Sequence, residues 1–399
     1  MNSLYLAPDT VASCEARPAV LKKVCFVVNG CERDPMGIRA RSFAERLQNY
    51  DIDIIYRAGN KIVSAARILW ALYKTRPYTI YVFDMAFSGV VGAILYALTT
   101  ECRLVIDTGD VIGLLADSMG SRGWIARKLT HALEAVSISL ADGLVVRGHV
   151  HCEHLRRRAR NIWVIPDGVD TEQFGIGSSN ELRQQLNLQN YVVLGVLGSI
   201  TWNRKWGMCY GWELVQALAK LRDLPVKGVV IGDGNGLERL KAMAREFDVA
   251  DRMVFLGRIP YEKLPLHLGL FDICLSTQTN DLVGQVRTTG KLPLYLACGK
   301  QVIATEVGEA KRVLPSSMLL RYDGIKDRAY PARLAKRLRE IIGSGEWQTA
   351  GSQSRAIAKE RFDYSVLINV VRRALAENDA REVHGRGRWR VAASSRAGE

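Results

Sequence analysis

The sequence lacks the features that mark secreted and membrane-spanning proteins. Its eight cysteines are scattered and form no C-x-x-C pair, a usage that fits a reducing cytosol better than a disulfide scaffold. Residues 1–18 contain no basic region followed by an apolar stretch, so no secretory signal is predicted. The most apolar segment, residues 85–98, is shorter than a bilayer span and is expected to form a buried helix. We therefore expect a cytoplasmic protein.

Several catalytic signatures are also missing. The sequence has no G-x-x-x-x-G-K-[ST] loop, no G-x-S-x-G elbow and no recognisable Cys/His nucleophile pairing, which argues against P-loop and acyl-transfer enzymes. His149, His151 and His154 cluster near residue 150, but the arginines at 156–158 would repel a cation, so no metal site is predicted. That arginine run is either a solvated face or a surface for anionic lipid.

Acidic residues are few relative to basic ones. The formal net charge is +14 at pH 7 and the sequence pI is about 9.5. Such a balance favours acidic partners: phosphorylated ligands, anionic lipid surfaces or nucleic acid. Aromatic and basic residues are interleaved only around Trp389, which is too little to indicate a nucleic-acid surface. We expect no nucleic-acid partner.

The pattern of apolar runs predicts an α/β protein of two domains. A chain of 399 residues is long for a single hydrophobic core. Apolar runs typical of buried strands alternate with helical patterns, as in parallel, doubly wound sheets. The strands are expected at 24–28, 51–56, 79–83, 103–107, 143–146, 162–165, 191–197, 226–231, 253–256, 272–275 and 301–304. The helices are expected at 38–47, 62–73, 87–98, 124–140, 150–160, 209–221, 237–247, 261–270, 291–298, 331–342, 347–361 and 364–377.

Residues 164–174 separate two such series. Pro166, Asp167 and Gly168 supply turn chemistry after a short apolar strand, and a fresh series begins at Tyr191. We interpret this stretch as a hinge that faces a cleft; the alternative is an ordinary turn inside one domain. The expected order is a flexible leader (1–20), two Rossmann-like domains (21–170 and 171–361), a helix that crosses back to the first domain (362–378) and a basic flexible tail (379–399).

The loop at residues 198–207 is suited to an anion. It follows a predicted strand at Gly198 and precedes a helix, where backbone N–H groups and the helix dipole attract negative charge. Arg204 or Lys205 would add a point charge to a phosphate. The structural alternative is a solvated loop that happens to be basic.

Two further stretches carry polar groups at predicted strand or helix ends. The Gly-rich segment 284–299 brings Arg287 and Lys291 to the start of a helix, where they would again suit phosphate oxygens; the alternative is a set of structural caps. Asp107 and Asp110 follow a strand, the edge at which open α/β sheets bind ligands. Either carboxylate could act as an acid or base or hold a substrate hydroxyl, or form turn bonds instead.

Several motifs, in order along the chain, together resemble glycosyltransferase family 4, whose members are retaining enzymes of the GT-B fold. The resemblance covers most of residues 160–315 and extends more loosely to the first half. Its main motifs are Val164-Ile-Pro-Asp-Gly-Val-Asp170 with Phe174, Ile231-Gly-Asp-Gly234, Asp251-Arg-Met-Val-Phe-Leu-Gly257, and Lys291-Leu-Pro-Leu-Tyr-Leu-Ala-Cys-Gly299.

The resemblance implies a GT-B protein with two Rossmann-like domains facing across a cleft, the first for the acceptor and the second for a nucleotide-sugar. Lys205 falls at the diphosphate-binding lysine, Gly37 at the glycine that lets backbone approach the donor phosphates, and Arg258 where the base usually lies. No cofactor or metal is implied. The implied catalytic residues are Lys205, Asp107, Asp110 and Arg287. The implied donor-binding residues are Gly37, Gly198, Ser199, Arg204, Asp233, Gly234, Gly257, Arg258, Lys291, Leu292 and Leu294.

The chain departs from the family pattern at three places. Ser199 replaces an arginine that contacts the diphosphate, and Arg204 or Arg287 is the expected substitute. Val286 and Leu294 replace a pair of glutamates, of which the second holds the ribose hydroxyls; losing that charged hydrogen bond costs roughly 1.5–3 kcal/mol, or about 10- to 150-fold in affinity. The Asp107 and Asp110 region replaces a histidine.

The implied function is transfer of a sugar from a UDP- or GDP-sugar to a glycan or lipid-linked acceptor in polysaccharide or glycoconjugate assembly, with the anomeric configuration kept. The protein would work in the cytoplasm, at an anionic inner membrane surface. Two alternatives stand beside it: a catalytically degenerate GT-B binding module, and a sugar-nucleotide epimerase.

Overall fold

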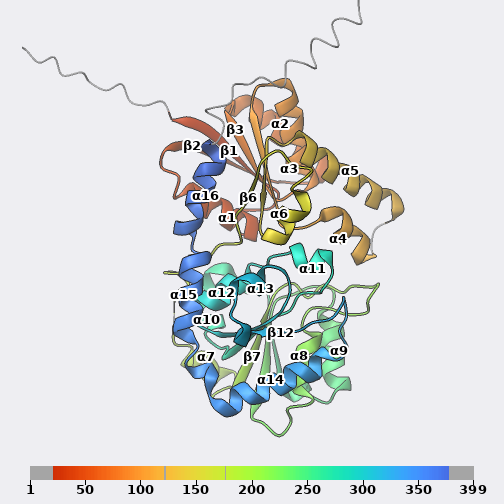
Figure 1. Cartoon of the computed structure of the whole chain (residues 1–399), viewed down its shortest axis with the longest axis vertical. Helices are drawn as coiled ribbons and strands as arrows, with labels where there is room; N and C mark the ends of the chain where they lie inside the picture. The colour runs from red at the N-terminus through yellow and green to blue at the C-terminus, as the bar shows by residue number, and fades with distance from the viewer. Residues whose placement is uncertain (1–20, 121–122, 176, 377–399) are drawn as a thin grey trace, which may run out of the picture.

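A computed structural model describes residues 21–120, 123–175 and 177–376. The expected leader (1–20) and tail (379–399) lie outside the described residues. Within them the chain forms two parallel six-stranded sheets, each with helices on both faces, stacked along the long axis of the molecule (Figure 1). We call the first sheet with its helices the first lobe and the second the second lobe. The predicted α/β class is confirmed.

The strands of the first lobe follow the order β2-β1-β3-β4-β5-β6. Each lies within about two residues of its expected position, because strands buried on both faces read as continuous apolar runs. β1 is central and pairs in parallel with both β2 and β3. The strands are β1 (Lys22–Val28), β2 (Tyr50–Tyr56), β3 (Thr79–Phe83), β4 (Arg103–Thr108), β5 (Gly143–Val146) and β6 (Ile162–Val164).

The helices of the first lobe divide between the two faces of its sheet. Side chains of α2, α3 and α5 pack against one face. The other face is covered by α1 together with α16, the last helix of the described chain. The helices are α1 (Pro35–Ala44), α2 (Lys61–Thr75), α3 (Phe87–Thr99), α4 (Ile112–Met119), α5 (Trp124–Leu140), α6 (His149–Leu155) and α16 (Tyr364–Ala376).

The strands of the second lobe follow the order β12-β11-β10-β7-β8-β9. Helices again cover both faces, and the two cores lie on opposite sides of the sheet. The strands are β7 (Val192–Leu197), β8 (Val226–Ile231), β9 (Met253–Gly257), β10 (Ile273–Ser276), β11 (Gln301–Thr305) and β12 (Leu319–Leu320). The helices are α7 (Asn180–Gln185), α8 (Trp212–Leu218), α9 (Leu237–Glu246), α10 (Leu264–Leu268), α11 (Leu282–Val286), α12 (Lys291–Ala297), α13 (Gly308–Val313), α14 (Tyr330–Ser344) and α15 (Gly351–Arg361).

Two chain crossings connect the lobes, and they lie side by side. The backbone N–H of Val169, in the expected hinge, donates to the oxygen of Phe362 at 2.9 Å, and the N–H of Tyr364 donates to the oxygen of Val169 at 3.1 Å. Beyond this point α16 packs Leu367 and Val371 into the first lobe, and Figure 1 shows it running alongside that sheet. The two segments that cross between the lobes are therefore joined by backbone hydrogen bonds.

Among the described residues, no helix has the length and apolar character required to cross a bilayer.

Candidate active site

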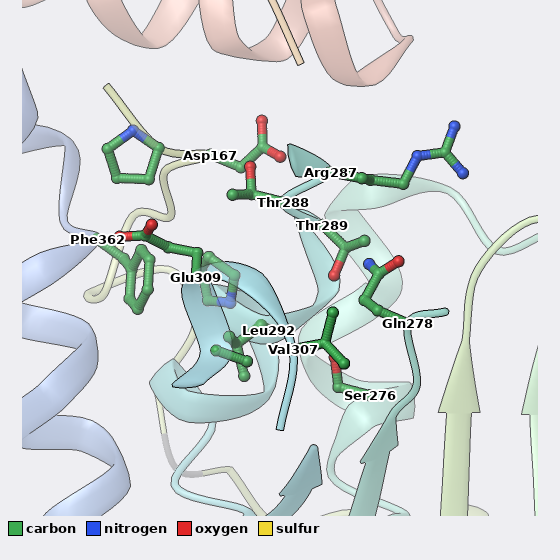
Figure 2. Close-up of a pocket in the computed structure, with 13 residues that line it drawn as sticks. Asp167, Ser276, Gln278, Arg287, Thr288, Thr289, Leu292, Val307, Glu309 and Phe362 are labelled. Atoms are coloured by element: carbon green, nitrogen blue, oxygen red, sulfur yellow. The ribbon is translucent and has the colours of Figure 1, made fainter. Parts of the chain in front are cut away.

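A pocket with about 390 Å³ of empty space, part of it open solvent, lies where the two lobes meet the hinge. The hinge contributes Pro166 and Asp167, and the end of β10 contributes Ser276 and Gln278. Figure 2 shows Asp167, Ser276 and Gln278 with other residues that line the pocket. The remaining lining residues come from the α11–α12 loop, α12, α13 and the return crossing: Arg287, Thr288, Thr289, Leu292, Pro293, Val307, Glu309, Ala310 and Phe362.

Most polar groups of this lining can bind a polyhydroxylated ligand. Hydroxyl and amide side chains both donate and accept hydrogen bonds, as sugar hydroxyls do. The hydroxyl oxygen of Thr288 is buried and has no hydrogen-bond partner, although buried hydroxyls usually have one. The pocket therefore offers a hydrogen-bonding group that the protein itself does not satisfy.

Arg287 links the pocket to the first lobe. Its side chain extends away from the other lining residues (Figure 2), and its Nε lies 2.7 Å from Oδ1 of Asp110. Burial favours a raised pKa for Asp110, but the charge and hydrogen bonds of Arg287 outweigh burial and lower that pKa below its usual value. Asp110 is thus an anion that faces a cation across the gap.

Lys291 lies at the first position of α12, four residues after Arg287. Its Nζ is 3.6 Å from the ring centroid of Tyr210. Burial, together with the charge of Arg287, lowers the pKa of Lys291 to about 7, while the nearby carboxyl group of Glu213 acts in the opposite direction. Burial raises the pKa of Glu213, in turn, to about 7. One oxygen of Glu213 is buried without a hydrogen-bond partner.

The loops after β7, β8 and β9 are joined by backbone hydrogen bonds. The N–H of Gly198 donates to Ile231 and the N–H of Gly232 donates to Gly257, at 3.0 and 2.8 Å. A Cβ on Gly232 would lie 1.9 Å from the oxygen of Gly198, and φ of Gly232 is 143°. Only glycine allows these two loops to approach so closely. The three strand ends thus form one rigid rim beside the interlobe gap.

Comparisons with known proteins agree with this architecture. Residues 191–343 match the family model described as "Glycosyl transferases group 1". Over 90% of this chain, the structure resembles sucrose-phosphate synthase of Thermosynechococcus elongatus, with a TM-score of 0.70, 18% identity and 100% of that chain covered. HepE of Anabaena in complex with UDP is similar, with a TM-score of 0.68, 16% identity and coverage of 90% of this chain and 100% of that one. The fold is GT-B.

The curated relatives found by sequence match a smaller part of this chain than the similar structures do. The GDP-mannose-dependent alpha-(1-6)-phosphatidylinositol monomannoside mannosyltransferase of Mycolicibacterium smegmatis is 30% identical over 152 residues, which is 37% of this chain and 38% of that protein. The chain spans less than half the length of the curated relatives it matches.

In this GT-B structure Lys205 lies at the rim of the gap. Its side chain is exposed, and its Nζ is 5.4 Å from the ring centroid of Trp206. A Cβ on Gly120, at the end of α4 in the first lobe, would lie 3.7 Å from the Cβ of Lys205. Ser199 and Arg204, on the same loop, are also exposed. The loop therefore reaches the first lobe but does not line the pocket.

Asp107 and Asp110 have different surroundings. The carboxyl group of Asp107 is fully buried and lies 3.0 Å from Nε of Arg39 and 3.4 Å from Nε of Arg147. Arg39 also donates to the oxygens of Ile165 and Pro166 at 2.8 and 2.6 Å. Asp107 therefore anchors the hinge, whereas Asp110 is the carboxylate that reaches the second lobe.

The remaining predicted residues are spread around the rim. Gly37 is buried in α1, where a Cβ would lie 2.3 Å from the backbone oxygen of Cys31. Asp233 accepts a hydrogen bond from the N–H of Gly234 at 2.7 Å. Gly257 has φ of 68° and open space around it, and the exposed Arg258 lies 3.4 Å from Oδ1 of Asp34 in the first lobe.

Leu292 and Leu294 are both 7% exposed and both pack in the core beneath α12. Leu292 also lines the pocket. Leu294, where the resemblance leads us to expect a ribose-binding glutamate, is thus apolar and inward.

Two acidic residues of the site were not identified from the sequence. Glu309 accepts from the backbone N–H of His149 at 2.9 Å, with its other oxygen 2.9 Å from Nδ1 of the same residue. Glu213 lies in the helix Trp212–Leu218, whose residues are apolar except Glu213 and Gln216. An acidic residue inside an apolar helix face is a signal that could have indicated Glu213, but nothing local distinguishes Glu309. The described part of the chain holds no cluster of metal-binding side chains.

Proposed function

We propose that the chain is a retaining glycosyltransferase of family 4 type, which moves a sugar from a UDP- or GDP-sugar to a glycan or lipid-linked acceptor. The observation that carries this proposal is the interlobe site: the lobe that matches the group 1 glycosyl transferases presents Arg287 and a hydroxyl-lined pocket to Asp110 of the first lobe. HepE of Anabaena binds UDP, and the similar mycobacterial protein is GDP-mannose-dependent, so both bases are retained as candidates.

The reaction breaks the bond between the anomeric carbon and the diphosphate and forms a bond from the same face of the sugar to the acceptor oxygen. Negative charge gathers on the leaving diphosphate, and the acceptor hydroxyl loses its proton. Cations that meet this charge stabilise the transition state more than the ground state. Each contributes roughly 4 kcal/mol of gross attraction at about 4 Å and an effective dielectric constant of about 20.

Three cations are assigned to the diphosphate: Arg287, Lys291 and Lys205. Arg287 is paired with Asp110 in this structure, so the diphosphate would replace the carboxylate of Asp110 as the partner of Arg287. Asp110 would then become free to contact the acceptor hydroxyl. Lys291 would gain a proton as the diphosphate arrives, because an adjacent anion raises the pKa of an amine. A lipid-linked acceptor would bring the protein to the inner, cytoplasmic face of a membrane.

The first experiment is thermal unfolding of the full chain with UDP or GDP. A nucleoside diphosphate at 100 times its Kd adds about 2.7 kcal/mol to stability, so one of the two should raise the Tm. A degenerate module would show no shift with either. A panel of nucleotide-sugars, scored by donor hydrolysis, then identifies the donor.

Lys205→Ala is expected to lower turnover by about tenfold or more without unfolding the protein, since it removes one charge from the leaving group. Lys336→Ala, on the exposed side of α14, is the matched control and should leave turnover unchanged. Turnover of Lys205→Ala equal to that of the control would remove Lys205 from the mechanism.

A further inference from the structure

Three neighbouring helices of the first lobe expose large apolar side chains. α2 packs against α3, and α3 packs against α5; all three cover the same face of the sheet (Figure 1). Soluble surfaces seldom gather so many large apolar groups on adjoining elements. The exposed ones are Ile62, Val63, Trp70, Tyr73, Phe87, Leu95, Leu98, Trp124, Ile125, Leu129, Val136 and Leu140.

In α5 the apolar side faces outward. Leu129 is 66% exposed, and at 100° per residue it lies within a sector of about 60° with Ile125, Val136 and Leu140. Trp124, at the first position of the helix, is 62% exposed at the edge of this face. Two polar residues lie on the inner side of α5: Ser137 is buried, and Glu134 is buried and accepts hydrogen bonds from the backbone of Ile112 and Gly113 in α4. A helix whose apolar side faces water needs something apolar to cover it.

The same surface is positively charged. Glu134, which is buried, is the single acidic residue in the sequences of α2, α3 and α5. Lys74 lies over the ring of Trp70 at 5.6 Å, and Lys128 lies over the ring of Trp124 at 5.1 Å. The exposed arginines 156–158 follow α6, and the charge of Arg158 reaches the carboxyl group of Glu134.

We infer that the outer face of α2, α3 and α5 docks on an anionic membrane surface. Tryptophan, tyrosine and aliphatic side chains would enter the boundary between headgroups and acyl chains, while the lysines and arginines meet the lipid phosphates. Protein partners are less suited, because lysine is depleted in protein interfaces. α5 alone presents about 25 Å of helix to the bilayer.

Docking in this way places the active site close to lipid. α4 packs on α5 and begins two residues after Asp110, and its far end at Gly120 adjoins Lys205. A lipid-linked acceptor could then enter the interlobe gap from the membrane. This last consequence rests on the proposed function; the docking surface itself does not.

The test is flotation of the full chain with vesicles of phosphatidylcholine alone or mixed in equal parts with phosphatidylglycerol. The wild type should float with the mixed vesicles, less so at high salt. The double variant Trp124→Ser, Leu129→Ser should lose about tenfold or more of this binding, with circular dichroism and Tm as checks on folding. Leu266→Ser, an exposed residue of α10 in the second lobe, is the matched control and should float like the wild type.

Failure of the wild type to float, or equal flotation of the double variant, would overturn the inference. A dimer in light scattering that the double variant abolishes, without vesicle binding, would assign the surface to a second copy of the chain and also overturn it. Donor hydrolysis without vesicles is measured in the same samples. It should be unaffected by the double variant, so loss of docking and absence of transferase activity are separate results.

Discussion

Arg287 and Lys291 belong to one short segment, yet their surroundings shift their pKa values in opposite directions, upward for Arg287 and downward for Lys291. Arg287 keeps its charge through the ion pair with Asp110, whereas Lys291 has a pKa of about 7 because burial and the charge of Arg287 disfavour its ammonium form. Arginine stays charged in every environment, whereas a buried lysine readily changes its pKa and can gain its charge when an anion binds. Lys291 is therefore the residue whose charge should report the arrival of a diphosphate.

Affinity for a nucleoside diphosphate should fall as pH rises above about 7, by up to about tenfold per pH unit, because Lys291 must then take up a proton on binding. In Lys291→Arg, which stays charged, this part of the pH dependence should vanish. Calorimetry in two buffers of different ionisation enthalpy measures the proton uptake directly. Identical pH profiles for the two proteins would contradict the assignment.

Lys291 also affects stability, in the opposite direction with pH. Its pKa falls from 10.5, the ordinary value that applies to the unfolded chain, to about 7 in the folded one. Between these values the unfolded state binds more protons, so the contribution of Lys291 to the free energy of unfolding rises with pH.

At the scale of elements, the site depends on the close approach of the loops after β7 and β8. Gly198 and Gly232 bring the two strand ends together, and the backbone N–H of Leu197 donates to Oη of Tyr295 in α12 at 2.6 Å. The rim is thus a product of backbone packing rather than of any charged residue.

Gly232→Ala should lower the free energy of unfolding by roughly 2 kcal/mol or more, because its Cβ would lie 1.9 Å from the oxygen of Gly198 and its φ is 143°. Gly343→Ala, in α14 with nothing within 4 Å of the new Cβ, should instead stabilise the protein by up to about 1 kcal/mol. Denaturant unfolding measures both. Equal stability of the two variants would show that the rim tolerates a side chain.

Across the molecule, three side-chain ion pairs between described residues span the gap between the lobes. Asp34 meets Arg258 at 3.4 Å, Asp110 meets Arg287 at 2.7 Å, and His149 meets Glu309 at 2.9 Å. None of these residues belongs to a hydrophobic core cluster. The three contacts therefore join the lobes beside the packing of α6 on α11 and α13 and the two crossings at the hinge. Such contacts can be exchanged for a ligand without unfolding either lobe.

Glu309→Ala should open the gap, since it removes the acceptor of both the N–H and the ring of His149. We expect a larger radius of gyration in solution scattering without nucleotide, and a loss of about 1–3 kcal/mol in the free energy of unfolding, because Glu309 is buried and its removal leaves the N–H of His149 without its acceptor. Glu306→Ala removes a pair with Lys311 inside the second lobe and should leave the scattering unchanged. Superimposable scattering curves for Glu309→Ala and the wild type would show that the contact between Glu309 and His149 does not hold the gap closed.

Most long elements were predictable from local pattern, and the short ones were not. The helix at 124–140 and the strand at 143–146 coincide with α5 and β5. α4 and α11 were not predicted. The first N–H groups of α4 are satisfied by Glu134 from α5, and α11 is capped by Asp281 and packs against α6. Helices of a turn or two are stabilised by such tertiary contacts rather than by their own sequence.

The alternation of buried strands and helices, and with it the doubly wound lobes, could be read from local pattern, because burial on both faces of a parallel sheet leaves a continuous apolar run. The sequence also indicated the glycine-rich loops and the cations Arg287 and Lys291. Only the tertiary structure decided which charges meet: Asp110 and Arg287 are 177 positions apart, and Glu309 reaches His149 from the other lobe. The physical reason is that an electrostatic interaction depends on distance and burial in space, which no periodicity along the chain records.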